Sequence, residues 1–492
     1  MDIKVPENAV KIIRILEEAG FEAYVVGGCV RDAVLGREPE DWDITTSARP
    51  DEMMRAFEEA GINAGARGRK GAPAGEAPMK IVPTGLKHGT VTVVFDVCSK
   101  PAEDEEGAAE VTGHEHESYE VTAYRIDGEY KDARHPETVT FVRELREDLA
   151  RRDFTVNAMA YSKRDGLIDP FNGMKDLERG LLRCVGDPEE RFSEDALRIL
   201  RCVRFASQLG FVIEEETARA MYEKLPLLDK VSPERVRVEF GKLLMGKGAE
   251  KVLEEHREVI AQFIPETRAM FDLDQENPFH LYDVWMHTVH AVGAAGRSAD
   301  GHSVTGCRDR VLALAAFFHD IGKPPCKIVD RGWGHFYHHE HVGADMTDEI
   351  MRRLRYDNET RKTVVMLIKK HGTVFNPDGK QPRRLLAKLG AEDLGRLIAL
   401  ERADVSAQHP DYVEERLANI DEFEKRVEEA AAGEECFSIS ALAITGDDIM
   451  ALGVEQGREV GRIKNALFDM VVDGDIENDR ETLLAAARDM VS

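Results

Sequence analysis

The stretch AYVVGGCVRDAVLGREPEDWDIT, residues 23–45, decides the fold of the amino-terminal part of this chain. AYVV predicts a short buried strand, because it is apolar and rich in valine. Gly27 and Gly28 predict a turn, and residues 29–35 predict the helix that follows it. DWDIT, residues 41–45, is strand-like again. This order of strand, turn, helix and strand predicts a small mixed α/β domain.

The same stretch carries a candidate site for a nucleoside triphosphate. Asp41 and Asp43 are two residues apart, so on a strand both carboxylates lie on one face, as a site for two divalent ions requires. Gly27 and Gly28 leave backbone amides uncovered at a helix start, where phosphate binds, and Arg31 follows within the first turn. Alone, an Asp-x-Asp pair is more often surface acid, and a Gly-Gly turn more often serves only the backbone. The combination is much more specific.

The segments around this stretch complete the predicted α/β domain. An amphipathic helix precedes it over residues 6–19, and two further strands follow over residues 90–97 and 119–125. Two low-complexity stretches interrupt the domain: residues 63–78 are rich in Gly, Ala and Pro, and residues 99–118 are acidic. We expect both to be exposed insertions between strands.

From Arg151 onward the sequence is overwhelmingly helical, and strand patterns nearly vanish. RRDFTVNAMA, residues 151–160, predicts the start of a helix that carries Arg152 and Asp153. Glycine and proline breaks divide the helical part into modules. We therefore expect an α/β head, a helical neck, a second helical module and a tail, over residues 1–150, 151–265, 266–425 and 426–492.

A charged helix in the neck is a candidate for reading a nucleotide base. RFSEDALRILRCVRF, residues 191–205, spaces Asp195, Arg198, Arg201 and Arg204 so that they neighbour one another along one helical face. A salt-bridged solvent face is the alternative. Cytosine and adenine each present an amine beside a ring-nitrogen acceptor, which one carboxylate and one guanidinium satisfy together. Asp195 with Arg198 is such a pair, and the other two arginines would meet the triphosphate.

Histidines and aspartates predict a separate metal site in the third module. His319 and Asp320 end the apolar run VLALAAFF; His287 precedes them in a predicted helix, and Asp404 follows. This order resembles the HD superfamily of metal-dependent phosphohydrolases, and it implies a divalent transition-metal ion held by these four side chains. A second metal is a further use for some of four histidines in between, His338, His339, His341 and His371. Such a domain is either a phosphodiesterase or phosphatase, or a structural or RNA-binding module.

Composition narrows the classes of protein. The chain has 492 residues, of which 42% are hydrophobic and 32% charged, as in a globular protein of several domains. The amino terminus is too polar for a signal peptide, and the longest apolar run is too short to span a bilayer. We therefore expect a cytosolic protein without a membrane partner. The seven cysteines form no CxxC pair, which favours reduced thiols.

The formal net charge of −27 disfavours non-specific binding of nucleic acid, which depends on neutralising phosphates. Any RNA contact must therefore use a local basic patch. Residues 361–388 are the candidate, with eight Lys and Arg residues against the single acid Asp378. A solvated helix face explains that stretch equally well.

An ordered series of motifs resembles bacterial tRNA nucleotidyltransferases and the related poly(A) polymerases. The series covers roughly residues 20–250 and consists of GGCVRD…DWD, HGTVTV (88–93), YRIDGEYKDARHPETVTFV (124–142), RRDFTVNAMA, FNGMKDLERGLLRCVGDPEERFSEDALRILRCVRF and VSPERVRVEF (231–240). TGDDIMALGVEQGREVGRIKNAL, residues 445–467, resembles the tail module that helps to position the tRNA body in members with an HD domain.

The resemblance implies roles for the head residues. Asp41 and Asp43 would bind the catalytic metal, Mg²⁺. A third acid would complete the site, with Glu120 as our candidate and Asp96 as the alternative. The stretch from Asp127 to Arg134 resembles the flexible loop used in switching from C to A addition. The residues expected to contact the nucleotide are Gly27, Gly28, Arg31, Arg152, Asp153, Asp195, Arg198, Arg201 and Arg204.

We therefore expect an enzyme that adds CCA to tRNA 3′ ends from CTP and ATP and releases pyrophosphate. A poly(A) polymerase or an enzyme that adds only part of CCA is the alternative in the same class, because the motifs are nearly shared. An HD phosphohydrolase with a relic head is the alternative of another class, although the intact Asp41, Asp43 and Asp195 argue against it. A non-enzymatic RNA-binding regulator is the remaining alternative.

Overall fold

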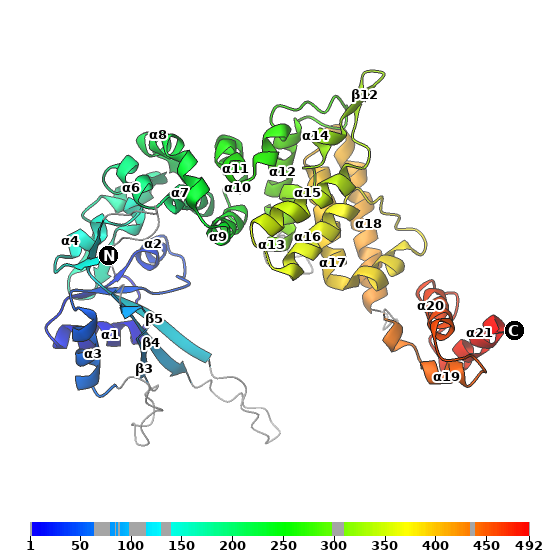
Figure 1. Ribbon diagram of the computed structural model, residues 1–492, viewed down its shortest axis with the longest axis horizontal. Helices are drawn as coiled ribbons and strands as arrows, with labels where there is room; N and C mark the ends of the chain where they lie inside the picture. Colours follow the sequence, from blue (N-terminus) through cyan, green and yellow to red (C-terminus); the bar gives the residue numbers. More distant parts are fainter. Residues whose placement is uncertain are drawn as a thin grey trace. The chain divides into compact units, whose positions relative to one another are not determined.

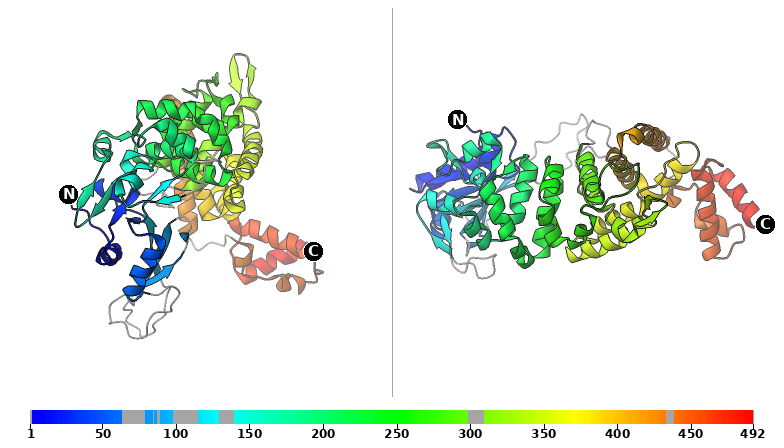
Figure 2. Two further views of the ribbon diagram at one scale, coloured as in Figure 1. Left: turned by 60° about the vertical axis from the view of Figure 1, so that its left-hand side comes forward. Right: turned by 90° about the horizontal axis from the view of Figure 1, so that it is seen from above.

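The computed structural model describes residues 2–62, 79–83, 85–86, 89–97, 115–128, 139–297, 309–432 and 438–491. The chain divides into two compact units, shown in Figures 1 and 2. The first unit is Met1–Ala206 with Gly210–Val231, and the second is Ser207–Leu209 with Ser232–Ser492. The predicted insertion over residues 63–78 lies outside the described residues.

The first unit is built on a seven-stranded sheet in the order β3-β4-β5-β2-β1-β8-β9. Its strands are β1 (Ala23–Val26), β2 (Ile44–Thr46), β3 (Met79–Val82), β4 (Thr90–Val97), β5 (Glu115–Ala123), β8 (Ala160–Ser162) and β9 (Gly166–Ile168). Neighbouring strands are antiparallel except for β2 and β5, which run parallel. The predicted mixed α/β head is therefore confirmed.

Several predicted elements of the head are confirmed, and two differ. Strands β1 and β4 and helices α1 (Glu7–Glu18) and α2 (Gly28–Val34) match the sequence patterns. Strand β2 begins only at Ile44, so Asp41 and Asp43 lie in the segment before it rather than on a strand. Strand β5 begins at Glu115, because its pairing with β4 continues to Val97. Residues 115–118 are therefore sheet and not insertion.

The region after Arg151 contains more strand than the sequence predicted. β8 and β9 belong to the head sheet, but each has only three residues, too few to display a period of two. Residues 151–160 form no α-helix: a 3-10 turn over Thr155–Asn157 leads directly into β8. The remaining helices of this unit are α3 (Pro50–Glu59), α4 (Leu145–Ala150), α5 (Gly173–Arg179), α6 (Pro188–Glu194), α7 (Leu197–Leu209) and α8 (Glu215–Glu223).

The predicted helix over residues 191–205 is two helices with a break between them. Helix α6 ends at Glu194, the backbone of Asp195 is extended, and α7 starts at Leu197. The Asp195 carboxylate accepts a hydrogen bond of 3.0 Å from the Leu197 amide. A capping aspartate of this kind satisfies a helix-end donor and so stabilises the break.

The second unit is helical around an aromatic core. Its central helices, α12 (Val284–Arg297), α13 (Arg310–Phe318), α15 (His339–Arg353), α16 (Asn358–Lys370) and α17 (Gln381–Ser406), lie side by side (Figure 1). Phe317 on α13 packs against Phe240 at 5.0 Å and Trp285 at 6.0 Å between ring centroids. These buried rings explain why VLALAAFF is apolar all round.

The other elements of this unit are short or peripheral. They are α9 (Pro233–Leu244), α10 (Ala249–Glu255), α11 (Arg257–Phe263), α14 (Lys323–Cys326), the hairpin β12 (Ile328–Asp330) with β13 (Trp333–His335), and α18 (Val413–Ala432). The tail helices α19 (Gly446–Met450), α20 (Arg458–Val472) and α21 (Arg480–Val491) pack on a small core of their own around Ile449, Ile463 and Leu483. Among the described residues, we find no helix with the length and apolarity needed to cross a bilayer.

Gly173, the first residue of α5, provides a test of this packing. A Cβ at this position would lie 2.4 Å from the Thr155 carbonyl oxygen, so α5 approaches the 3-10 turn more closely than alanine permits. We expect Gly173→Ala to destabilise the first unit by about 1–3 kcal/mol. Calorimetry should show a melting midpoint lowered by roughly 3–10 °C. The control Gly461→Ala on α20, which meets no atom within 4 Å, should lose no stability.

Candidate functional site

Three acidic residues lie near one another at the interior strands β2 and β5 of the head sheet, close enough for the charges of Glu120 and Asp41 to act on Asp43. In the parallel pair of β2 and β5, Ile44 lies opposite Val121. Asp43 and Glu120 immediately precede these two partners and are therefore neighbours across the strands. Asp41 lies two residues before Asp43 in the sequence. We call Asp41, Asp43 and Glu120 the acidic cluster.

The register also separates the two candidates for the third acid. Asp96 on β4 pairs with His116 on β5. His116 precedes Glu120 by four residues, which corresponds to roughly 13 Å along a strand. The structure therefore brings Glu120, and not Asp96, to the level of Asp43.

Electrostatics support a cation site at the acidic cluster. The pKa of Asp43 is raised above its ordinary value, first because protein atoms displace water around the carboxylate and then because Glu120 and Asp41 repel its charge. The Arg152 guanidinium opposes this rise in the pKa. A group of mutually repelling carboxylates suits divalent cations with oxygen ligands.

The Gly-Gly turn lies against Arg152. Gly27 has φ of +85°, and a Cβ on it would lie 2.7 Å from Nη1 of Arg152. The positive φ favours glycine here, and a larger residue would also require the guanidinium to shift. Nη2 of Arg152 lies 3.6 Å from the buried Asp148 carboxylate, which holds the side chain between the turn and the acidic cluster. Gly28 begins α2, one residue before the predicted start of the helix.

Arg31 is a buried residue rather than an exposed one. Its guanidinium donates to Oδ1 of Asn157 at 2.6 Å and to the neighbouring Asp32 carboxylate. It also lies 5.1 Å from the centre of the Phe205 ring. Arg201 and Arg204 approach the same ring at 5.2 and 3.8 Å, so three guanidinium groups surround one aromatic side chain.

Arg201 is held by Asp153. The Asp153 carboxylate accepts from Nε of Arg201 at 2.8 Å and lies 2.6 Å from its Nη2. Although burial acts to raise it, the Arg201 charge and the Asn157 amide keep the pKa of Asp153 well below its usual range. Asp153 and Arg201 therefore form one rigid unit, as bidentate ion pairs do.

Asp195 and Arg198 lie together at the break between α6 and α7, but they are held by different partners. Arg198 donates to the Glu194 carboxylate at 2.5 Å and to the Arg151 carbonyl at 2.9 Å, and it is 8% exposed. Asp195 caps α7. No role was predicted for Glu194 from the sequence, although a glutamate four residues before an arginine is a recognisable pattern for a helical ion pair.

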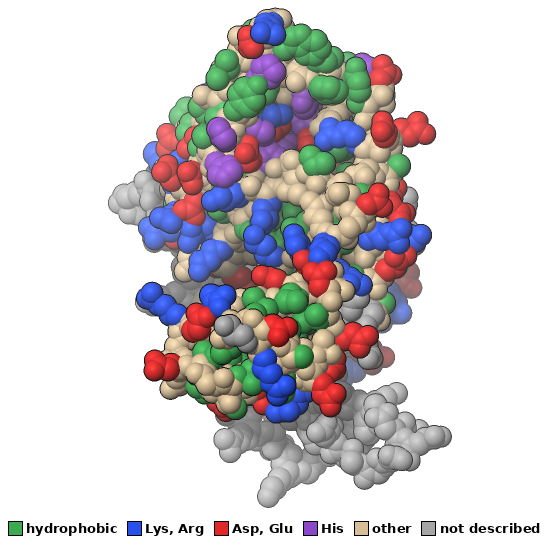
Figure 3. Space-filling view, turned by 90° about the vertical axis from the view of Figure 1, so that its right-hand side faces the viewer, with side chains coloured by type: hydrophobic (Ala, Val, Ile, Leu, Met, Phe, Trp, Pro, Cys, Tyr) green, Lys and Arg blue, Asp and Glu red, His purple; other side chains and the backbone are tan. Residues whose placement is uncertain are grey.

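The second candidate site is a cluster of imidazoles and carboxylates in the helical unit. His287, His319 and Asp404 bring ligand atoms within 4.8 Å of one another, and so do Asp320, His339 and His371. Asp320 joins the two groups. Its Oδ2 lies 3.2 Å from Nε2 of His319, and its Oδ1 lies 3.4 Å from Nε2 of His339. We call these six residues the His/Asp cluster; the space-filling view shows histidines around a hollow (Figure 3).

The four imidazoles of this cluster share one orientation. Each places Nδ1 near a backbone carbonyl: at 3.2 Å for His287 and Ala407, 2.8 Å for His319 and Ala316, 2.7 Å for His339 and Phe336, and 2.5 Å for His371 and Ile368. An Nδ1 proton bonded to the carbonyl leaves Nε2 as the free acceptor, and every Nε2 points into the cluster. This arrangement fits metal ligation.

The charges of the cluster depend on one another. Burial alone would lower the pKa of His319, but the Asp320 and Asp404 carboxylates raise it to about 10. In turn, the neighbouring imidazoles hold the pKa of Asp404 well below its usual range despite burial. Buried imidazoles and carboxylates that compete for protons in this way also suit a divalent cation, because the cation displaces the protons.

At two residues near this site, His341 and Lys323, the structure differs from the prediction. His341 is not part of the His/Asp cluster: it is exposed and forms a separate group with His338 and Glu340. No role was predicted for Lys323 from the sequence, although it follows Asp320 by three residues. It is 5% exposed, and its Nζ lies 2.7 Å from Oδ2 of Asp320.

Known protein families match three parts of the chain. The poly A polymerase head domain matches residues 23–75 and 83–183, the probable RNA and SrmB- binding site of polymerase A matches residues 210–270, and the HD domain matches residues 284–427. Together these matches account for the head, the helices that follow it and the His/Asp cluster.

Complete proteins are similar as well. The CCA-adding enzyme of Geobacillus kaustophilus is 46% identical over 49% of this chain and 50% of that enzyme, so the alignment spans half of this relative. The CCA-adding enzyme of Lactobacillus delbrueckii subsp. bulgaricus is 31% identical over 97% of this chain and 96% of that enzyme. The crystal structure of the Bacillus stearothermophilus CCA-adding enzyme in complex with CTP superposes with a TM-score of 0.64 and 26% identity, covering 99% and 98% of the two chains.

The pair of Asp153 and Arg201 predicts a pH-dependent loss of stability. Arg201→Ala leaves a buried carboxylate without its partner, which should destabilise the head by about 3 kcal/mol at pH 7. The pKa of Asp153 is lowered in the folded protein, so the pair stabilises the head fully above about pH 4 and loses this contribution as the pH falls further. The deficit of the variant should therefore shrink in acid.

Thermal unfolding at pH 7 and pH 3 measures this difference. Arg14→Ala is the control, because it removes only an exposed pair with Glu18 and should change stability little at either pH. An equal deficit of Arg201→Ala at both pH values would mean that the arginine acts through packing and not through its charge.

Proposed function

This chain belongs to the CCA-adding enzyme family, and we propose that it adds CCA to the 3′ end of tRNA from CTP and ATP, with release of pyrophosphate. The observation that carries the proposal is the acidic cluster, in a chain that aligns with such an enzyme over 97% of its length. A tRNA substrate also leads us to place the protein in the cytoplasm.

The acidic cluster would hold Mg²⁺, which when bound activates the attacking 3′-hydroxyl and offsets charge on the leaving pyrophosphate. The chain itself supplies position and charge, as is usual in phosphoryl transfer, and it needs no protein base. Arg152 lies beside Gly27 and within electrostatic reach of Asp43, so we assign it to the incoming phosphates. Arg204 would add to the positive charge of that region.

Base selection would use the break between α6 and α7. The Arg198 guanidinium is fixed by Glu194 and by the Arg151 carbonyl, so it can present its remaining edge without reorganising. Asp195 lies three residues earlier. One acceptor and one donor in fixed positions suit cytosine and adenine and leave uracil and guanine mismatched. In this assignment Arg201 is a positioning residue, because Asp153 occupies its guanidinium.

The alternatives differ in their products. A poly(A) polymerase would make long A tails, and a partial-adding enzyme would stop early. The predicted switching loop from Asp127 to Arg134 falls mostly outside the described residues, so it favours neither. A relic head would not need three acidic residues whose charges repel one another, and the acidic cluster therefore argues against a relic head.

The His/Asp cluster favours a second activity, the hydrolysis of phosphate esters. Its six residues would hold two divalent transition-metal ions, which when bound would polarise the phosphate and supply a nucleophilic water. In the reaction the water oxygen bonds to phosphorus, the ester P–O bond breaks, and the leaving alcohol takes a proton. Lys323, beside Asp320, would contact the phosphate.

Incorporation of labelled CTP and ATP into tRNA transcripts ending before CCA, after C and after CC tests the first proposal. We expect ordered C, C, A addition that then stops, and its loss in Asp43→Ala. Glu120→Gln should lower kcat by roughly 10²–10³-fold. Asp96→Asn is the matched control and should stay near wild-type activity. Long A tails or early arrest would support the alternatives above, and no incorporation on any acceptor would remove the head proposal.

Metal content tests the second proposal. After loading with Mn²⁺ or Ni²⁺ and desalting, the wild type should retain about two ions per chain. Asp320→Ala should retain almost none, because this residue contributes to both groups, and it should not hydrolyse p-nitrophenyl phosphate. His341→Ala should behave as the wild type. Full metal retention by Asp320→Ala would contradict the assignment of the cluster.

A further inference from the structure

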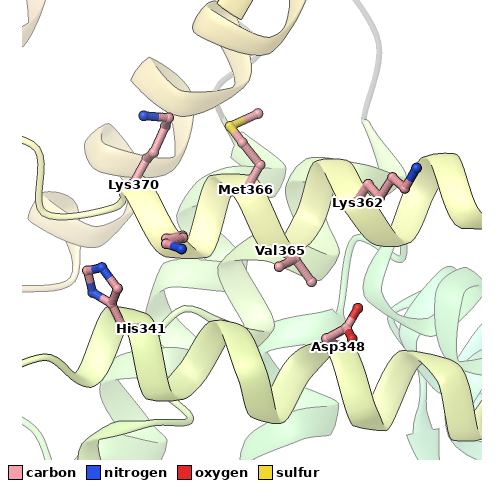
Figure 4. A pocket seen from close by; sticks show the side chains of 7 residues that line it. His341, Asp348, Lys362, Val365, Met366 and Lys370 are labelled. Atoms are coloured by element: carbon pink, nitrogen blue, oxygen red, sulfur yellow. The ribbon is translucent and has the colours of Figure 1, made fainter.

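A basic pocket opens beside the His/Asp cluster, between helices α15 and α16. It has a volume of about 470 Å³. His341 and Asp348 line it from α15, and Lys362 and Lys370 line it from α16 (Figure 4). Lys369 and the apolar side chains of Val365 and Met366 complete the lining. We call this site the lysine pocket.

The charge of the lysine pocket is not balanced within the protein. Among the residues that the structure describes, no carboxylate lies within 4 Å of Lys362, Lys369 or Lys370. The one acid of the pocket, Asp348, is already paired with Arg352 at 2.6 Å and with Arg361. Unbalanced positive charge in a pocket favours an anionic ligand.

Two other basic residues of the same stretch, Lys380 and Arg384, are already paired with acids. Lys380 lies 2.8 Å from the Asp475 carboxylate, and Arg384 lies 2.6 Å from Asp473. The stretch over residues 361–388, which the sequence offers as a single candidate patch, is thus divided by the fold. In its first half, Lys362, Lys369 and Lys370 line a pocket without a neutralising acid.

Two residues that line the lysine pocket are close in sequence to residues of the His/Asp cluster. Lys370 precedes the cluster residue His371, and His341 follows the cluster residue His339 by two positions. From Lys370 the pocket extends along α16 to Lys362, eight residues earlier, which is roughly 12 Å of helix. A ligand with one phosphate at the cluster can therefore place further phosphates on the lysines.

We propose that the lysine pocket binds the backbone phosphates of an RNA strand whose terminal phosphate ester reaches the His/Asp cluster. The substrate of the cluster is then an RNA end of at least two nucleotides and not a free mononucleotide. This proposal rests on the hydrolytic function proposed for the cluster. Val365 and Met366 provide an apolar floor for a sugar or base between the phosphates.

Binding of a fluorescein-labelled RNA trinucleotide with a free 3′-hydroxyl, measured by anisotropy on the full chain, tests the pocket independently of hydrolysis. Lys362→Ala and Lys369→Ala should each raise Kd roughly fivefold, as expected for the loss of one exposed charge contact. Each should also reduce the slope of log Kd against log salt by about 0.7. Lys380→Ala is the matched control from the same stretch and should change neither quantity.

Hydrolysis of the trinucleotide 3′-phosphate and of 3′-AMP completes the test. The lysine variants should raise KM for the trinucleotide and leave its kcat and both constants for 3′-AMP unchanged. Equal effects on 3′-AMP, or trinucleotide binding that does not change, would overturn the proposal. If the wild type hydrolyses neither compound while the lysine variants still lose binding, the hydrolytic function fails and the pocket remains an RNA site.

Discussion

The parallel pairing of β2 with β5 is the constraint on which the head depends. Backbone hydrogen bonds of the sheet, and not any attraction between side chains, hold Asp43 beside Glu120. Two carboxylates repel each other, so this arrangement stabilises nothing by itself, and the surrounding sheet must hold it. Arg152 offsets part of the repulsion and is itself kept in place by the absence of a side chain at Gly27. A sheet that holds negative charges close together in this way favours the binding of cations.

In the His/Asp cluster, burial and packing hold the charged side chains close together. Its imidazoles are oriented by backbone carbonyls, and the turn that carries Asp320 is pressed against α15. A Cβ on Gly322 would lie 2.2 Å from the His339 carbonyl oxygen and 2.5 Å from the amide nitrogen of Gly343. This contact between backbones fixes Asp320 relative to His339, so that one carboxylate reaches both groups of ligands. Metal binding there is a property of packing as much as of ligand type.

Internal pairing decides which basic side chains can serve RNA in a chain of net charge −27. Arg198 and Arg201 are fixed by Glu194 and Asp153, so their role is directional. Lys380 and Arg384 are paired with Asp473, at the end of the tail helix α20. Among the described residues, no carboxylate lies within 4 Å of the lysines along α16, so these lysines are available to an anionic ligand. Positive charge is thus concentrated at a few sites while most of the surface repels phosphate.

The sequence by itself determined the order of the elements in the head, the family resemblance and most of the residue types at both sites. Local patterns suffice for these, because glycine turns, valine-rich strands and ligand spacing depend on near neighbours in the chain. Only the tertiary structure decided between Glu120 and Asp96, because register is set by pairing between distant strands. The tertiary structure also showed that the predicted helix is interrupted at Asp195 and that the short strands β8 and β9 belong to the head sheet. It showed as well that His341 lies in a different group from His339. Each of these outcomes depends on partners far apart in the chain, which periodicity within a short window does not record.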